Sequence, residues 1–234
     1  MRKSGWFFLL FFLMFSFVSV SSGSPLCIDG VSVNKKIKCL KEIRDKNVVK
    51  QSLDYSCGPA GLATLLNIYL HDSVGEKQII KALMKSIDIA KVKERHGFSL
   101  LDLKNFAEKR GYRVTGYKMD IDFLKQINAP VLVPIKFKNF RHFIVIKAVV
   151  GDRVFIADPA MGNMSMKIDR FLSIWQGGIG LVVEETPELR DPFRPPWQMH
   201  RTLMRDLASV PDYKVISASA LESTIRTTFH IAEW

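Results

Sequence analysis

The chain has 234 residues, 47% of them hydrophobic, and 34 Lys and Arg against 23 Asp and Glu give it a formal charge of +11. This length and apolar content suffice for one core of ordinary size, so one main domain is expected. The basic residues are spread along the chain and form no patch interleaved with aromatic residues. A basic surface facing an anionic envelope or acidic partners is therefore favoured, and nucleic-acid binding is not expected.

Residues 1–23 have the pattern of a secretory signal peptide. Arg2 and Lys3 precede a nearly unbroken apolar run of 15 residues from Trp6 to Val20, and small residues follow. The run is shorter than the roughly 20 residues of a membrane-spanning helix, which favours cleavage over retention as an anchor. Cleavage removes two positive charges, leaves +9, and predicts a mature protein that is periplasmic or secreted.

The rest of the chain is expected to fall into three segments, which are an extension over 24–47, the main domain over 48–185 and a tail over 186–234. The tail opens with PELRDPFRPPWQMH, which holds four of the ten prolines of the chain. Such a proline-rich stretch is typical of an extended linker on the surface.

Three cysteines are present, and their number is informative in an exported protein. Cys27 and Cys39 are twelve residues apart and can form a disulfide in an oxidising compartment, although sequence does not fix the pairing. That pairing leaves Cys57 as an unpaired thiol, and an odd cysteine in an exported protein is a candidate reactive group.

The predicted elements begin with helices. Apolar residues at helical spacing predict a helix over 57–70 with one buried face, and Pro59 is tolerated in its first turn. A second helix is expected over 76–85. The third follows Ser99, whose capping box includes Asp102, and ends at Gly111.

After Gly111 the hydrophobic period changes to two, which predicts strands with two short helices between them at 121–128 and 170–176. Turns are expected at Gly151–Asp152 and Gly162–Asn163. The predicted strands cover 112–119, 131–137, 142–150, 153–158, 164–168 and 179–185. The predicted class is therefore α+β, with N-terminal helices packed on a C-terminal antiparallel sheet.

Cys57 is the candidate nucleophile. A thiol attacks as the thiolate, and the unpaired amides and dipole at the start of a helix favour negative charge there. Gly58 is interpreted as leaving room for a substrate carbonyl, and Gln51 is placed to donate its side-chain amide to an oxyanion beside the Cys57 amide. A buried structural thiol remains the alternative at this point.

His142 is the best candidate for the base among five histidines. His71 lies at the far end of the predicted Cys57 helix, about 20 Å away at the helical rise per residue. His96 precedes a loop glycine, and His200 and His230 lie in the tail. His142 begins a predicted strand, from which it can face a helix terminus, although a half-exposed surface histidine is the alternative.

Asp158 is the candidate for the group that orients the imidazole. It ends the strand after that of His142, and the hairpin turns at Gly151–Asp152. The ideal register places Asp158 opposite Val145, so that the carboxylate and His142 project from opposite faces. We therefore expect a bulge, or a break imposed by Pro159, to turn one of them.

In their order along the chain, Gln51, Cys57, His142 and Asp158 resemble the papain-like fold in its peptidase C39 form, the peptidases that process bacteriocin leaders. The segments DYSCGPAGLATLL, RHFIVI and FIADPAMG carry the resemblance, which covers residues 48–183. It implies that Cys57 is the nucleophile, His142 the general base and acid, Asp158 the orienting carboxylate and Gln51 the oxyanion donor. It also implies a polypeptide substrate, often cut after small residues such as paired glycines.

A narrower resemblance is to the exported C39-like proteins of the Pseudomonas-type functional amyloid secretion system. The signal peptide, the segment GFSLLDLKNFAEKRGYRVTGYKM and the tail carry it. Many C39 relatives are fused to a membrane transporter, whereas this sequence contains no transporter spans. A partner from a secretion system in the cell envelope is therefore expected to act in trans.

The sequence thus predicts a cysteine endopeptidase without a cofactor. No Cys-x-x-Cys or His-x-x-x-His spacing indicates a metal, and QGGIGLVV precedes a strand instead of opening a helix, so no nucleotide is expected. One alternative is a cell-wall peptide amidase, transpeptidase or other acyl transferase with the same triad. Another is a docking module that binds a leader peptide without cutting it, for which loss of the nucleophile is the expected mark.

Overall fold

The structure is a computed structural model that describes residues 39–127, 129–137, 140–186 and 189, with the backbone of two short strands before them. Those strands, β1 (Leu26–Ile28) and β2 (Val31–Val33), form an antiparallel pair in the unit Met1–Lys38. All other elements belong to the unit Cys39–Trp234. The predicted signal peptide and nearly all of the predicted tail lie outside the described residues.

Helices occupy the first half of the larger unit. They are α2 (Leu40–Arg44), α3 (Cys57–Thr64), the π-helix η1 (Leu65–Tyr69), α4 (Glu76–Leu83), α5 (Ile89–Arg95) and α6 (Leu100–Lys109). The predicted starts of α3, α4 and α6 are correct. The capping box of α6 is present, since Ser99 Oγ accepts from the Asp102 amide and Asp102 Oδ2 accepts from the Ser99 amide. Helices α2 and α5 were not predicted.

The second half is a six-stranded antiparallel sheet of order β3-β8-β4-β5-β6-β7. Two further short helices, α7 and α8, lie between strands. The bounds are β3 (Arg113–Lys118), α7 (Ile121–Gln126), β4 (Val131–Phe137), β5 (Phe140–Val150), β6 (Arg153–Asp158), β7 (Gly162–Lys167), α8 (Ile168–Leu172) and β8 (Ile179–Glu184). The predicted α+β class is confirmed.

The turn predicted at Gly162–Asn163 is wrong, because both residues belong to β7. The chain turns earlier, over residues 159–161. Asp158 causes this, since its Oδ1 accepts hydrogen bonds from the amides of Ala160 and Met161 and so closes the turn before Gly162.

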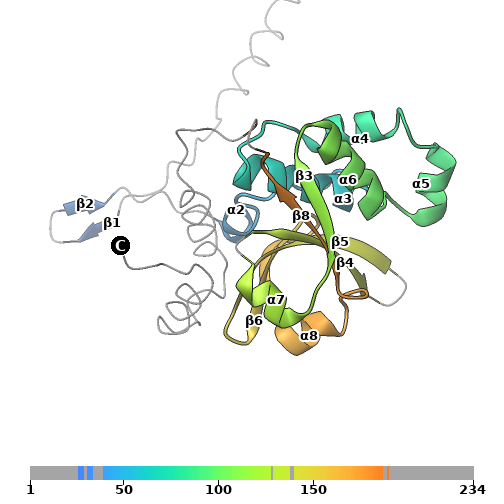
Figure 1. Ribbon diagram of the computed structural model, residues 1–234. Helices are drawn as coiled ribbons and strands as arrows, with labels where there is room; N and C mark the ends of the chain where they lie inside the picture. Colours follow the sequence, from blue (N-terminus) through green and yellow to red (C-terminus); the bar gives the residue numbers. More distant parts are fainter. Residues whose placement is uncertain are drawn as a thin grey trace, which may run out of the picture. The chain divides into compact units, whose positions relative to one another are not determined.

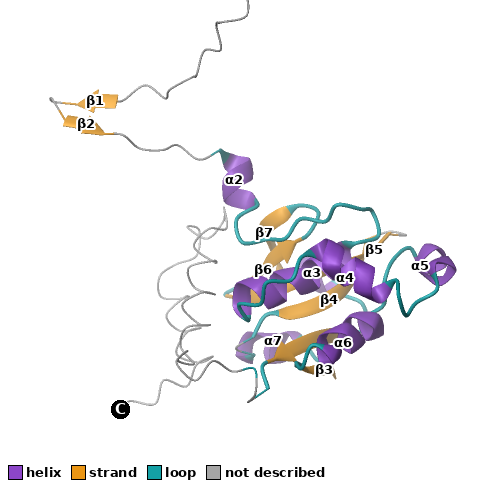
Figure 2. Cartoon of the chain, turned by 90° about the horizontal axis from the view of Figure 1, so that it is seen from above, coloured by secondary structure: helices purple, strands orange, loops and turns teal. Residues whose placement is uncertain are grey.

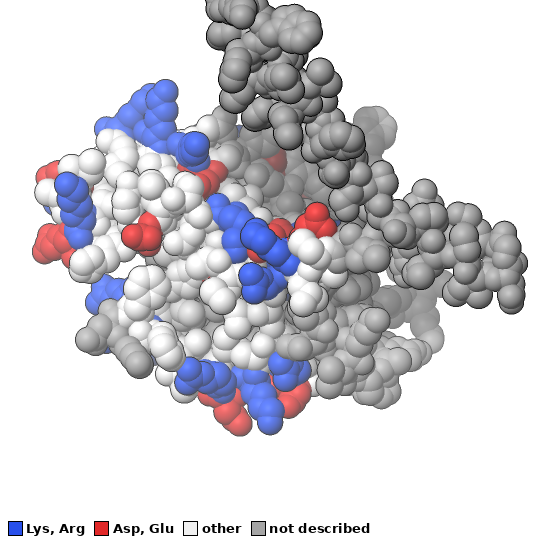
Figure 3. All heavy atoms as spheres, turned by 180° about the vertical axis from the view of Figure 1, so that it is seen from behind, with Lys and Arg blue, Asp and Glu red and all other residues white. Residues whose placement is uncertain are grey.

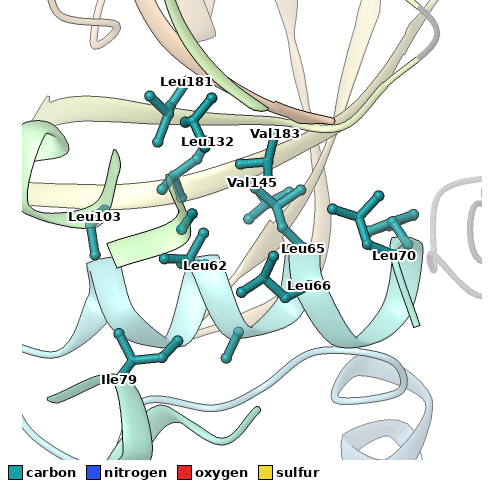
Figure 4. Close-up of a cluster of buried hydrophobic side chains, with 14 of the residues drawn as sticks. Leu62, Leu65, Leu66, Leu70, Ile79, Leu103, Leu132, Val145, Leu181 and Val183 are labelled. Carbon is teal, nitrogen blue, oxygen red and sulfur yellow. The ribbon is translucent and has the colours of Figure 1, made fainter. Parts of the chain in front are cut away.

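Two hydrophobic clusters lie on opposite faces of the sheet. Helices α3, α4 and α6 cover one face (Figure 1), and viewed from above in Figure 2, α3 crosses the sheet with α4 beside it. On the other face, α7 and α8 pack against alternate residues of β4, β5 and β6. Figure 4 shows the first cluster, in which leucines of α3 and η1 point toward Leu132, Val145, Leu181 and Val183 of the sheet.

Every residue of α3 is buried, so the prediction of a single buried face is wrong. The helix is enclosed on several sides because two glycines allow close approach. A Cβ on Gly58 would lie 2.9 Å from Leu103 Cδ1 of α6, and one on Gly61 would lie 2.7 Å from Leu132 Cδ1 of β4. The space beside Gly58 is therefore filled by the protein itself, not reserved for a substrate carbonyl.

Candidate active site

Cys57 is the first residue of α3, and its side chain is buried at 6% exposure. Its surroundings include a cleft of about 220 Å³ that is also lined by His142 of β5. Cys57 carries a free thiol. The side chain of Cys27 lies outside the described residues, so its pairing with Cys39 stays a prediction.

The hairpin of β5 and β6 contains a bulge at Lys147. Between the turn and Ala148 the paired residue numbers sum to 303, as predicted, and beyond the bulge they sum to 302, as in the pairs Ile146–Ile156 and Val145–Ala157. Lys147 is buried and donates to Asn163 Oδ1, while Asn163 Nδ2 donates to the Lys46 carbonyl at 2.7 Å. The sequence predicted either a bulge or a break at Pro159, and the irregularity in this hairpin is the bulge.

The bulge brings His142 and Asp158 to the same face of the hairpin. Continuing the shifted pairing by one residue places Asp158 opposite Ile144, which lies two residues from His142 and therefore on its face. The two side chains meet there, with His142 Nε2 2.9 Å from Asp158 Oδ1 and each residue 7% exposed.

The Asp158 carboxylate is fixed by three hydrogen bonds to one oxygen. Oδ1 accepts from the imidazole and from the amides of Ala160 and Met161, at 2.7 and 3.0 Å. Burial raises the pKa of Asp158, but the bond and charge of His142 and the two amides outweigh it and hold the pKa below its usual value. Asp158 is therefore ionised at neutral pH.

His142 is set up to carry a proton. Burial lowers its pKa, but the hydrogen bond to Asp158 and the interaction with the Cys57 side chain outweigh burial and raise the pKa to about 9. Because Asp158 occupies Nε2, the ring nitrogen left for the thiol is Nδ1, which is buried and makes no hydrogen bond within the described part of the chain. The Phe140 ring stacks on the imidazole with centroids 5.8 Å apart.

Gln51 lies in the loop that leads into α3. Its backbone N–H donates to the Pro159 carbonyl at 3.0 Å, which ties the loop to the residue after Asp158. Its side-chain Nε2 donates to the Leu53 carbonyl at 3.1 Å, and its Oε1 is buried and has no partner among the described residues. One N–H of the side-chain amide is thus used within the loop.

The structure adds residues that sequence reasoning set aside or missed. His96, which ends α5 with φ of 56°, lines the Cys57 cleft together with Arg95 and Arg141. The same three residues also line a second cavity of about 1040 Å³, whose wall includes Tyr55, Met84, Ile89, Val92, Phe137 and Phe140. Only the three-dimensional arrangement identifies these residues as part of the cleft, because α5 itself was not predicted.

On the face drawn in Figure 3, lysines and arginines are scattered and interspersed with acidic residues. Among the described residues, no three His, Cys, Asp or Glu side chains are grouped so that they could hold a metal ion. None of the helices in that part of the chain combines the length and apolar character needed to cross a membrane.

A model of the peptidase C39 family matches residues 45–188. The chain belongs to the peptidase C39 family. This C39 peptidase is 33% identical over 198 residues to the "probable functional amyloid protease FapD" of Pseudomonas fluorescens, and the match covers 83% of this chain and 86% of that protein. The FapD of Pseudomonas aeruginosa is 29% identical over 174 residues, which cover 74% of this chain and 76% of that protein.

A solved structure supports the same fold. The peptidase domain of Streptococcus ComA, described as a bi-functional ABC transporter involved in a quorum sensing pathway, matches with a TM-score of 0.51. The identity is 22%, and the match covers 59% of this chain and 98% of the ComA domain. The chain is thus a cysteine peptidase with the papain-like fold of C39 domains, as predicted.

Proposed function

We propose that this peptidase cleaves an exported polypeptide that belongs to a functional amyloid secretion system, with Cys57 as nucleophile. The observation that carries the proposal is the orientation of His142, whose Nε2 is bound by Asp158 while Nδ1 remains for the Cys57 thiol in a shared cleft. The match to two proteins named as probable functional amyloid proteases supports the biological setting.

The reaction begins from a charged pair. With a pKa of about 9, His142 holds a proton at neutral pH, and the imidazolium favours the thiolate of Cys57 beside it. The thiolate attacks the scissile carbonyl carbon, and His142 then gives its proton to the leaving amine as the C–N bond breaks. Water, deprotonated by the neutral His142, attacks the thioester and releases the acid and the thiol.

The oxyanion of the tetrahedral intermediate is assigned to two donors, the Cys57 amide at the start of α3 and the side-chain amide of Gln51. Donors fixed before the reaction stabilise this charge without reorganisation. Gln51 uses one N–H for the Leu53 carbonyl, which leaves its second N–H for the substrate oxygen.

The two cavities suggest how a polypeptide lies on the enzyme. The small Cys57 cleft favours small residues beside the scissile bond, and the larger cavity offers an apolar wall for side chains farther along the substrate. The two cavities share Arg95, His96 and Arg141, so one extended chain can occupy both. A substrate with small residues such as paired glycines at the cleavage site fits this arrangement.

We further propose that the protein works in the periplasm or outside the cell after removal of residues 1–23, and that a secretion-system partner in the envelope delivers its substrate. The apolar run preceded by Arg2 and Lys3 motivates the first part. N-terminal sequencing of the protein from a periplasmic extract tests it, and a chain that retains Met1 in the membrane fraction contradicts it.

Alkylation of Cys57 by iodoacetamide across pH tests the charged pair. The variant Cys27→Ser/Cys39→Ser leaves Cys57 as the single thiol. We expect a rate that stays on a plateau well below pH 8 and loses that plateau when His142→Ala is added. Slow alkylation at neutral pH, equal with and without His142, contradicts the mechanism and favours a docking module that does not cut.

Cleavage is tested on a mixture of denatured secreted polypeptides, with the Cys57→Ala variant as control. New amino termini are labelled and sequenced after incubation. We expect new termini that require Cys57 and that follow small residues. Termini that appear equally with Cys57→Ala come from another source and contradict the proposed peptidase.

A further inference from the structure

Glu76 is a buried carboxylate that the proposed mechanism does not use. It is the first residue of α4, and only 7% of it is exposed. Both oxygens bind one residue far upstream, with Oε1 accepting from the Ser52 amide at 2.8 Å and Oε2 accepting from the Ser52 hydroxyl at 2.7 Å. The carboxylate therefore holds Ser52 by its backbone and its side chain at once.

Ser52 is the residue next to Gln51. The backbone on its other side is held within the loop, because Ser56 Oγ accepts from the Leu53 amide and donates to the Leu53 carbonyl. That same carbonyl accepts the side-chain Nε2 of Gln51. The position of the Gln51 side-chain amide thus depends on a loop that Glu76 of α4 holds by two hydrogen bonds to Ser52.

A purely local role explains this contact less well. A glutamate in the first turn of a helix interacts favourably with the helix dipole while it stays in water. Burying the charge costs free energy that only well-placed hydrogen bonds offset. Glu76 is buried, and the bonds that offset the cost both go to the loop that carries Gln51.

We propose that Glu76 is a positioning residue for the oxyanion donor Gln51, and this rests on the function proposed for Cys57 and Gln51. By holding Ser52, the carboxylate keeps the Gln51 amide where the oxygen of the tetrahedral intermediate forms. Glu76 hydrogen-bonds neither Cys57 nor His142 in the described residues. Its loss therefore affects the acylation of Cys57 and not the nucleophilicity of the thiol.

Two reactions of the same thiol separate these effects. Iodoacetamide is attacked at a saturated carbon, so no oxyanion forms. The p-nitrophenyl ester of N-acetylglycylglycine is attacked at a carbonyl carbon, where an oxyanion forms before the thioester is made and nitrophenolate leaves. We expect Glu76→Ala to slow ester acylation by about 10- to 100-fold, which is less than the roughly 10²- to 10³-fold for outright loss of an oxyanion donor, and to leave alkylation within twofold.

Three further variants complete the test. Glu76→Gln keeps one carbonyl oxygen and should recover part of the acylation rate. Glu108→Ala removes an exposed carboxylate that pairs with Lys104 of the same helix, and it should change neither reaction. In a Gln51→Ala background, Glu76→Ala should have no additional effect on acylation, because the group that it positions is absent.

The outcomes distinguish this proposal from the one on which it rests. If Glu76→Ala lowers both reactions equally, or slows acylation further without Gln51, the residue supports the fold and the positioning role is wrong. Unchanged acylation in Glu76→Ala also overturns it. A wild-type protein that is alkylated at Cys57 but not acylated by the ester contradicts the proposed peptidase itself, and the role of Glu76 with it.

Discussion

The catalytic hairpin and the loop before α3 are held in place by different kinds of contact. In the hairpin, His142 and Asp158 project from neighbouring strands in the interior of the sheet, and backbone pairing on both strands fixes their separation. In the loop, the position of Gln51 depends on a few side-chain hydrogen bonds from Glu76 and Ser56.

This difference predicts opposite sensitivities. A hairpin specified by register tolerates many side-chain changes but not an added residue, because one residue turns every later side chain to the other face. A loop held by side chains responds in proportion to the bonds that are removed. Variants of the hairpin and of the loop therefore test the comparison directly.

The largest effect is expected from insertion of one alanine between Val145 and Ile146. With the bulge at Lys147 kept, the added residue places Val145 opposite Asp158, so that His142 and Asp158 face opposite ways and the imidazole loses its orienting carboxylate. We expect ester acylation to fall by about 10³- to 10⁴-fold, as when a triad loses the carboxylate that fixes the histidine tautomer. Lys147→Met keeps the number of residues, and its acylation rate should fall much less. An insertion variant that is folded by near-ultraviolet circular dichroism and keeps a tenth of the activity contradicts the register argument.

Asp158→Asn should have a smaller effect, of about tenfold on acylation at neutral pH. The amides of Ala160 and Met161 fix the oxygen side of the new amide toward the imidazole, so the hydrogen bond survives without the charge. Without that charge the pKa of His142 falls from about 9. The alkaline limb of the acylation profile should move to lower pH, and an unmoved limb rejects this account.

The same pair predicts how stability depends on pH. The folded pKa of His142, about 9, is above its unfolded value of 6.5, so its contribution is complete below pH 6.5 and is lost as pH rises through 9. The loss is about 3 kcal/mol in the free energy of unfolding. For Asp158, with a lowered pKa, stability is lost instead as pH falls below about 4. Urea unfolding between pH 6.5 and 9.5 measures the first slope, which should flatten in His142→Gln.

The smallest effect is expected from Ser52→Ala on the loop side. The variant keeps the bond from its amide to Glu76 Oε1 and loses the bond from its hydroxyl. One such bond contributes about 1 kcal/mol, so we expect acylation to fall by roughly threefold to tenfold while alkylation is unchanged. A loss as large as that of the alanine insertion in β5 contradicts a response of the loop in proportion to the bonds removed.

Sequence reasoning went furthest on the hairpin side. The Gly151–Asp152 turn and strand periodicity predicted the pairing. Because that pairing places His142 and Asp158 on opposite faces, the sequence also predicted a bulge or break as a correction to it. The position of the correction at Lys147 was not predictable. It depends on Asn163 and on the Lys46 carbonyl, which come from distant parts of the chain.

The helical side was predicted less completely. The start of α3 at Cys57 was correct, but its burial on all sides follows from contacts of Gly58 and Gly61 that no local pattern reveals. In the sequence, Glu76 is an ordinary acidic residue at the start of a helix. Its two hydrogen bonds to Ser52 are evident only from the three-dimensional structure.

The bulge also restricts how this protein can diverge. Residues added at the tip of the hairpin, around Gly151–Asp152, leave the pairing below them intact, so that turn is suited to natural insertions and to an inserted tag or reporter. A single residue gained between His142 and Lys147 reverses the face of the catalytic histidine relative to Asp158, whereas the loss of one residue there is absorbed by removal of the bulge. Length variation among functional descendants should therefore gather at the turn, and a library of random insertions would map that boundary.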